Sequence, residues 1–274
     1  MKRWLLYFGL LGILTAIFLL HNHTTDAFQP TSRGIGLIII GAGLGISATL
    51  LQGFYRNNVA DPGLMGLTTG ATIGSLISLK LGNEFGSRIG ILISVLFAFI
   101  SFYIFDWAKN KFIANGLLIT FIFSTPVFFL ANNSSHDSTF WLLGSFQELD
   151  KHNVKVFAPF VEVGIITSFF IARKILSDSR WIKVFVGVGV AFLLGPWVNV
   201  TGAIIGFSLF IPYLTRLLIK GDTRRVLSYA ALTGPIIMLV LDIVINFLNE
   251  ISVSVVALTF TLILSRVAKQ KTNS

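Results

Sequence analysis

Charged side chains are scarce in this sequence. Aspartate, glutamate, lysine and arginine account for 12% of the 274 residues, whereas hydrophobic residues account for 54%. A soluble domain of this size carries about a quarter charged residues. Because so few polar groups cannot cover a water-facing surface, the composition excludes an ordinary soluble protein and predicts a chain surrounded mostly by lipid.

Cysteine is absent, so the chain can form neither a disulfide scaffold nor a thiolate metal site. The four histidines are scattered, and no two of them have the spacing of metal ligands on one helix. The phosphate-binding pattern G-x-x-x-x-G-K-S/T and the zinc pattern H-E-x-x-H are also missing. We therefore expect no catalytic residue, no metal and no cofactor in this chain.

Ten segments are apolar and long enough to cross a bilayer, which needs about 20 residues. They are residues 4–20, 34–55, 63–79, 89–105, 112–131, 156–172, 182–198, 201–219, 227–248 and 251–265. The uncharged stretch 184–215 is too long for one span, and we expect its turn at the cluster of Gly195, Pro196, Asn199 and Gly202. Residues 2–20 begin like a signal peptide but lack a small-residue cleavage site, so they are predicted to remain as the first helix.

Positive charge is unevenly distributed over the connections between these spans. The formal net charge is +9, and sixteen of the 21 lysines and arginines fall on one side of a ten-span chain, with five on the other. The richer side of a membrane protein is cytoplasmic. We therefore place both termini in the cytoplasm, and read the excess charge as a signal of orientation and not of nucleic-acid binding.

Two acidic residues lie near membrane depth. Asp106 stands beside Trp107 and Lys109 at a cytoplasmic edge, and we expect it to be solvated there. Asp242 lies deeper, where an acid is either functional or hydrogen-bonded to a neighbouring helix. An ion-coupled secondary transporter usually needs several such groups, so this alternative is disfavoured. An intramembrane enzyme is disfavoured too, since the predicted spans contain no paired acid and base.

The connection between the second and third spans is unusually specific. Pro62 biases Asp61 away from helix, and glycines let the next helix approach its neighbours closely. We expect this turn to fix the second and third spans relative to each other. Its candidate functional residues are Gln52, Arg56, Asn57, Asp61, Pro62, Gly66 and Gly70.

A second specific segment begins near the eighth span. Its candidate residues, ending with the deep aspartate of the ninth span, are Gly202, Pro212, Arg216, Asp222, Arg224, Arg225 and Asp242.

Together these segments resemble the signatures of one permease family. The first is similar to S-G-x-x-x-Q followed by R-N-P-L-A-D-P-x-x-L-G-x-S-x-G-A. The second is similar to G-x-I-x-F-V-G-L-I-V-P-H-x-x-R followed by D-H-R-R. The family comprises the permease subunits of ABC importers for ferric siderophores, haem and cobalamin (FecCD/BtuC-like, type II importers). A weaker match, W-x-x-G-S, falls at residues 141–145, and the resemblance covers about residues 33–268.

The resemblance implies an all-α, polytopic membrane protein with about ten transmembrane helices and a single permease domain over residues 1–274. Its expected location is the cytoplasmic membrane of a bacterium, and its expected cargo an iron chelate, either a ferric siderophore or haem. Cobalamin or another chelate of the same family is the alternative. The expected partners are a second permease, two cytoplasmic ATPase subunits that hydrolyse ATP, and an extracellular or periplasmic binding protein.

Three departures from the family pattern stand out. The cytoplasmic connection after the sixth span is shortened, so the ATPase contact is expected at Ser177, Asp178 and Arg180. The last span keeps an acid at Glu250 but lacks the usual proline and glycine. Asn246 replaces the arginine that usually follows the aspartate by four residues. These differences are typical of a divergent partner in a permease heterodimer, which we favour over a homodimer, or of a lineage with a smaller ATPase contact.

The charge distribution generates a topology prediction that the absence of cysteine makes easy to test. Asn83→Cys and Ser135→Cys should react with an impermeant maleimide from outside the cell. Lys109→Cys, Asp222→Cys and Lys271→Cys should react only after permeabilisation. Labelling of position 222 from outside would contradict the ten-span arrangement.

Overall fold

A computed structural model describes residues 29–108, 111–132, 146, 149–172, 174, 180–202, 207–219 and 223–247, and these residues form helices without a strand. The helices are α2 (Gln29–Tyr55), α3 (Leu67–Lys80), α4 (Arg88–Ala108), α5 (Phe112–Asn132), α7 (Lys151–Ala172), α8 (Arg180–Thr201), α9 (Phe207–Leu218) and α10 (Thr223–Phe247).

Six of these helices, α2, α4, α5, α7, α8 and α10, are long and apolar enough to cross a membrane. The other two are shorter, since α3 has 14 residues and α9 has 12. The all-helical, multi-span prediction is confirmed for this part of the chain. The predicted spans 4–20 and 251–265 lie outside the described residues, so the count of ten and the side of the termini stay predictions.

Of the cluster at which the turn was expected, only Gly202 lies at the break between the two helices. Helix α8 continues through Gly195 and Pro196 to Thr201, and the chain breaks at Gly202, whose φ of 73° is left-handed. Gly195 serves helix packing instead, because a Cβ there would lie 2.6 Å from the backbone nitrogen of Val95 in α4. A left-handed residue just after a helix is a common way to end it.

Two other predicted boundaries move for local reasons. The third span starts at Leu67 and not at residue 63, because residues 57–66 form an irregular turn that ends in left-handed Gly66 (φ 77°). The sixth starts at Lys151 and not at residue 156, because the Asp150 carboxylate accepts a hydrogen bond of 2.7 Å from the Asn153 amide. Aspartate is a favoured N-cap residue, and this cap starts the helix two turns before Pro159.

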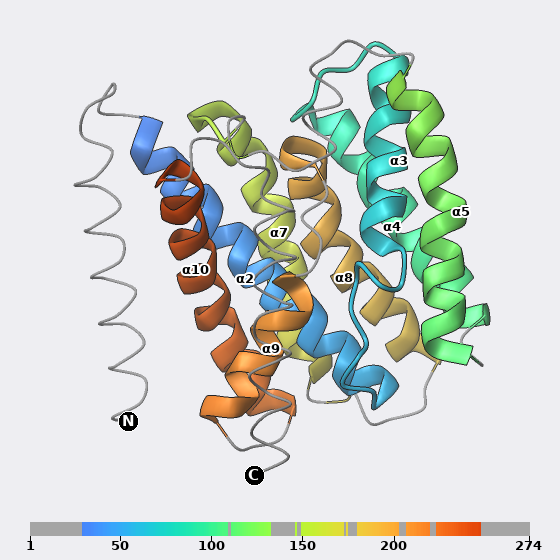
Figure 1. The fold of residues 1–274 in the computed structure, drawn as a ribbon, viewed down its shortest axis with the longest axis vertical. Coiled ribbons are helices and arrows are strands. Elements are labelled where there is room, and N and C mark those ends of the chain that lie inside the picture. The colour runs from blue at the N-terminus through green and yellow to red at the C-terminus, as the bar shows by residue number, and fades with distance from the viewer. Residues whose placement is uncertain are drawn as a thin grey trace.

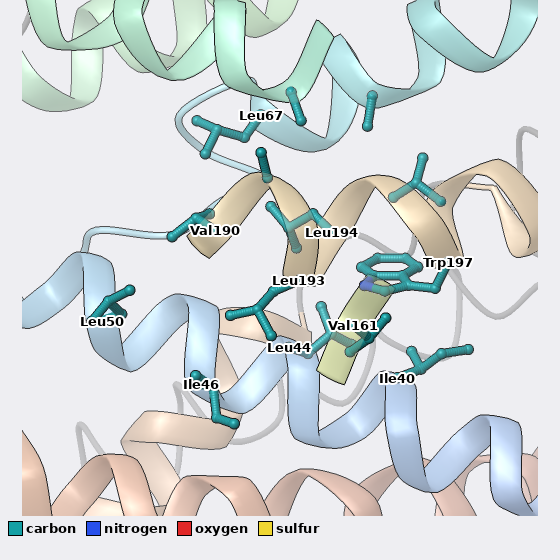
Figure 2. Close-up of a cluster of buried hydrophobic side chains, with 14 of the residues drawn as sticks. Ile40, Leu44, Ile46, Leu50, Leu67, Val161, Val190, Leu193, Leu194 and Trp197 are labelled. Carbon is teal, nitrogen blue, oxygen red and sulfur yellow. The ribbon is translucent and has the colours of Figure 1, made fainter. Parts of the chain in front are cut away.

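Helix α2 passes diagonally through the bundle, with α9 and α10 on one side and α3, α4 and α5 on the other (Figure 1). Helix α8 lies between these groups and packs against α2, α3, α4 and α7. Figure 2 shows the apolar side chains at this centre, including Leu44 of α2, Val161 of α7, and Leu193 and Trp197 of α8. All four are completely buried.

Small residues set the helix spacing in two places. Gly41 and Gly45 of α2 lie directly against the backbone of Gly234 and Ala230 of α10. Gly70 of α3 lies against α4, where a Cβ would be 2.7 Å from the Ser101 Cβ and 2.9 Å from the Phe97 carbonyl oxygen. The expectation that the turn before α3 fixes this helix against α2 does not extend to Gly70, because α3 packs mainly on α4.

This packing predicts the effect of filling the α3–α4 contact. Gly70→Leu should lower stability by roughly 1–3 kcal/mol, because packed interiors tolerate added volume poorly. The yield of detergent-extracted protein and its melting temperature should fall, and uptake of two different chelates should fall together. The control is Gly189→Ala in α8, where the nearest atom to a Cβ would be 3.3 Å away. Normal assembly with loss of only one chelate would contradict the structural role of Gly70.

Candidate functional site

The two signature segments meet where α2 ends. Gln52 lies in the last turns of α2 and Arg216 near the end of α9, 164 residues later in the sequence. The Arg216 guanidinium donates a hydrogen bond of 3.1 Å from Nη2 to Oε1 of Gln52. Gln52 is only 4% exposed, so its amide depends on partners inside the protein. The two signature segments are thus parts of one structural junction.

Asp61 organises the irregular turn that follows. Its carboxylate accepts a hydrogen bond of 3.0 Å from the Leu64 amide, and its carbonyl accepts one of 2.9 Å from the Met65 amide. The side chain is nearly completely buried, and burial raises the pKa of the Asp61 carboxyl above its usual range. The Ser208 hydroxyl of α9 and the turn amides act in the opposite direction on this pKa. The carboxylate of Asp61 therefore stabilises the turn that follows α2 from within.

The same turn is held from α4 and α5. The Ser101 hydroxyl of α4 donates a hydrogen bond of 2.8 Å to the Gly66 carbonyl, and the Thr120 hydroxyl of α5 donates one of 3.2 Å to the Gly63 carbonyl. Pro62 contributes its carbonyl, which accepts a bond of 2.9 Å from the Leu67 amide as α3 begins. A turn bonded to three helices fixes backbone geometry, and such a role does not need contact with cargo.

Arg56, the residue after the end of α2, has an uncommon backbone conformation. Its φ is 51°, in the left-handed region that glycine and asparagine usually occupy after a helix. The conformation is stabilised by the Asn57 amide, which donates to the Gln52 carbonyl at 3.1 Å, while the Asn57 side chain accepts from the Val59 amide at 3.0 Å. The Arg56 side chain is exposed beyond the end of the helix.

The second signature segment is distributed over several elements. Gly202 ends α8, and Pro212 lies inside α9, where it leaves the Ser208 carbonyl without its usual helical donor. Arg224 is the second residue of α10 and donates a hydrogen bond of 3.1 Å from Nε to the carbonyl of Ala172, the last residue of α7. Arg225 is exposed beside it. Asp222 lies outside the described residues.

Asp242 forms an ion pair with the opposite end of α2. Its Oδ1 lies 2.5 Å from Nη2 and 3.1 Å from Nε of Arg33, and the Asp242 side chain is completely buried. Of the two interpretations left open by the sequence, the geometry favours the acid bonded to a neighbouring helix. Arg33 supplies a guanidinium from α2, whereas the family pattern has an arginine at the position of Asn246. Sequence reasoning missed Arg33 because it is 209 residues from its partner.

The expectation that Asp106 is solvated at the membrane edge is wrong. Asp106 is 5% exposed, and its carboxylate forms a salt bridge with Lys183 of α8 and accepts a hydrogen bond from Tyr55 of α2. The only sequence signal for this site was a lysine at the same predicted membrane level in another span. Of the ATPase-contact candidates, Arg180 is the exposed first residue of α8, and Ser177 and Asp178 lie outside the described residues.

In the part of the chain that the structure describes, no three acidic or histidine side chains gather closely enough to hold a metal ion. The chemistry available at the junction is hydrogen bonding and ion pairing between helices. These interactions determine how the helices are positioned relative to one another.

Residues 29–265 match the FecCD transport family. The iron-uptake system permease protein FeuB of Bacillus subtilis is 26% identical over 266 residues, which cover 85% of this chain and 79% of FeuB. The cobalamin import system permease protein BtuC of Halobacterium salinarum is 28% identical over 228 residues, covering 75% of this chain and 62% of that protein. The fold resembles a solved inward-facing transporter of the metal-chelate ABC type, with a TM-score of 0.83, 24% identity, and 97% and 98% of the two chains covered.

The Arg33–Asp242 pair predicts a loss and a rescue. Arg33→Gln should lower stability by roughly 2–4 kcal/mol, somewhat less than for a fully buried pair because the Arg33 side chain is 27% exposed. Adding Asn246→Arg places a guanidinium one helical turn from Asp242 and should restore part of the melting temperature. Asn246→Arg alone is the control. An unchanged melting temperature in Arg33→Gln would show that the pair does not hold α2 to α10.

Proposed function

The chain belongs to the FecCD transport family, and we propose that it is the membrane-spanning permease subunit of an ABC importer for an iron chelate, a ferric siderophore or haem. The observation that carries the proposal is the junction at the end of α2. There the Gln52–Arg216 bond joins the two segments whose sequences resemble the family signatures. Six apolar helices supply the membrane-crossing body that such a subunit needs.

The permease does not itself hydrolyse ATP in this proposal. Two separate cytoplasmic ATPase subunits supply the energy, and an extracellular or periplasmic binding protein delivers the chelate. The closed ATPases bind one conformation of the permease better than the other, and this difference in affinity shifts the permease toward that conformation. The host membrane is the cytoplasmic membrane of a bacterium.

Ion-coupled transport has less support than ATP-driven transport. Asp106 and Asp242 are the acids within the described membrane-crossing helices that are buried, and each is paired with a basic side chain. Each acid is thus engaged by a partner from another helix, whereas an ion-coupled transporter usually uses several intramembrane ionisable groups for coupling. The geometry gives both acids a helix-joining role.

A second permease completes the pathway. Helix α5 is barely covered by its own chain, and its exposed apolar side chains include Leu117, Phe121 and Phe128. Such a surface is covered either by lipid or by another permease subunit. The departures after the sixth span and in the last span favour a sister permease over a second copy. Cobalamin is the alternative cargo, supported by the likeness to the cobalamin permease of Halobacterium salinarum.

We place the ATPase contact at residues 177–180, with the 216–225 connection and the cytoplasmic tail contributing. Arg180 is exposed at the start of α8, and Arg224 ties the start of α10 to the end of α7. The helix before residues 173–179 is bonded to α10 by Arg224, and the helix after them is bonded to α4 by Lys183.

The test is reconstitution of the permease with its partner permease, ATPase and binding protein in proteoliposomes. ATP should drive uptake of a ferric siderophore or haem. Replacement of residues 175–180 by glycine and serine should abolish the ATP hydrolysis that the loaded binding protein stimulates. Membrane insertion and the recovered amount of the two permeases should stay at wild-type level, which is the control for folding.

Each outcome separates the alternatives. Uptake of cobalamin without uptake of iron chelates would show that the cargo is cobalamin. Uptake driven by an ion gradient without ATP would show that the protein is a secondary transporter and not part of an ABC importer. Normal stimulation in the 175–180 variant would move the ATPase contact to another segment or to the partner permease.

A further inference from the structure

Three helix ends meet at one buried carboxylate, a group with no assigned part in the proposed transport. Lys183, in the first turn of α8, forms a salt bridge with Oδ2 of Asp106, in the last turn of α4. The hydroxyl of Tyr55, the last residue of α2, donates a hydrogen bond of 3.3 Å to Oδ1 of the same carboxylate. We name Tyr55, Asp106 and Lys183 the foot cluster.

Each charge of the foot cluster lies at the unfavourable end of its own helix. The amino end of a helix carries partial positive charge and repels a lysine, and the carboxyl end carries partial negative charge and repels an aspartate. Neither charge is favoured by its own helix, and the attraction between the two is available while α4 and α8 stay together. The pair therefore makes the relative position of these two helix ends energetically important.

Aromatic rings pack around the foot cluster. The Tyr55 ring contacts Phe105 of α4 at 5.7 Å and Phe112 of α5 at 5.4 Å between centroids, and the Lys183 ammonium lies 5.6 Å from the Tyr103 ring centre. Glycine at position 187 brings α8 against the Phe102 ring. This packing keeps water from most of the carboxylate, which strengthens the attraction between the charges.

The foot cluster is next to the proposed ATPase contact. Lys183 follows Arg180 by three residues, so the two lie within one turn of α8. At the other end of the 173–179 segment, the Arg224 guanidinium holds the carbonyl of Ala172. A force on Arg180 therefore reaches Asp106 through a single helical turn.

Helix α4 connects the foot cluster to α3 along much of its length. It packs along α3, where Gly70 and Gly74 lie against its backbone at Phe97 and Ile93. Buried hydroxyls join the same two helices, since Ser75 and Ser94 are hydrogen-bonded at 3.1 Å. Closely packed helices transmit displacement with little give, because their interiors are dense.

We propose that the foot cluster is a positioning element for transport, which makes the start of α8 move together with α4 and the end of α2 when the ATPases act. This inference rests on the proposed function. Breaking the Asp106–Lys183 pair should leave ATP hydrolysis intact while separating it from import.

The experiment uses the complete importer in proteoliposomes and measures chelate molecules imported per ATP hydrolysed. Asp106→Asn and Lys183→Gln should assemble with the ATPase and keep basal hydrolysis, and their import per ATP should fall about fivefold or more, the lower range of typical coupling between sites. The charge-reversed double variant D106K/K183D places both charges at the favourable helix ends and should recover coupling. Lys111→Gln, which removes an exposed lysine before α5, is the matched control.

A merely structural pair would change yield and melting temperature without changing import per ATP, and that result would overturn the inference. If the charge variants do not accumulate, Tyr55→Phe removes one hydroxyl and keeps the ring. Reduced import per ATP in Tyr55→Phe supports the inference, and a wild-type ratio overturns it. A wild-type importer with no ATP-driven uptake would instead refute the proposed function, and the inference would fall with it.

Discussion

Close approach of helix backbones is the constraint on which the rest of this structure depends. Lipid is as apolar as the helices, so burying leucine against leucine inside a membrane gains little, and packing must supply the energy. Glycines meet this need along α2, where Gly41 and Gly45 lie against the backbone of α10, and along α3, where Gly70 and Gly74 lie against α4. A side chain at any of these positions would separate two helices and everything bonded across them.

Helix α2 is tied at both ends by polar groups. At its beginning, Arg33 pairs with Asp242 of α10. At its end, Gln52 accepts from Arg216 of α9, and Tyr55 donates to Asp106 of α4. Unpaired polar groups are costly away from water, so these bonds select one register for each neighbouring helix. Helix α2 is thereby the element against which the positions of α4, α9 and α10 are set.

The irregular turn after α2 concentrates most of the first signature segment. Asp61 is bonded within the turn, the turn carbonyls accept from Ser101 and Thr120, and Ser208 of α9 lies beside the Asp61 carboxyl. These bonds restrict the turn to one backbone conformation. This restriction explains why the first signature segment specifies so many residue types over a short stretch. In an importer whose cargo differs among relatives, a rigid turn is a part that can stay the same while the pathway changes.

The sequence by itself determined that the chain is a helical membrane protein, approximately where its middle helices run, and that it carries the family's two signature segments. These properties depend on composition and on neighbours along the chain, such as the apolar runs and the Asp61-Pro62 pair. Only the tertiary structure decided that Gly70 faces α4, that Arg33 forms an ion pair with Asp242, and that Asp106 is buried against Lys183. The reason is physical. A glycine or a charge shows locally that a close contact or a partner is required, but which helix supplies it depends on packing between segments far apart in the sequence.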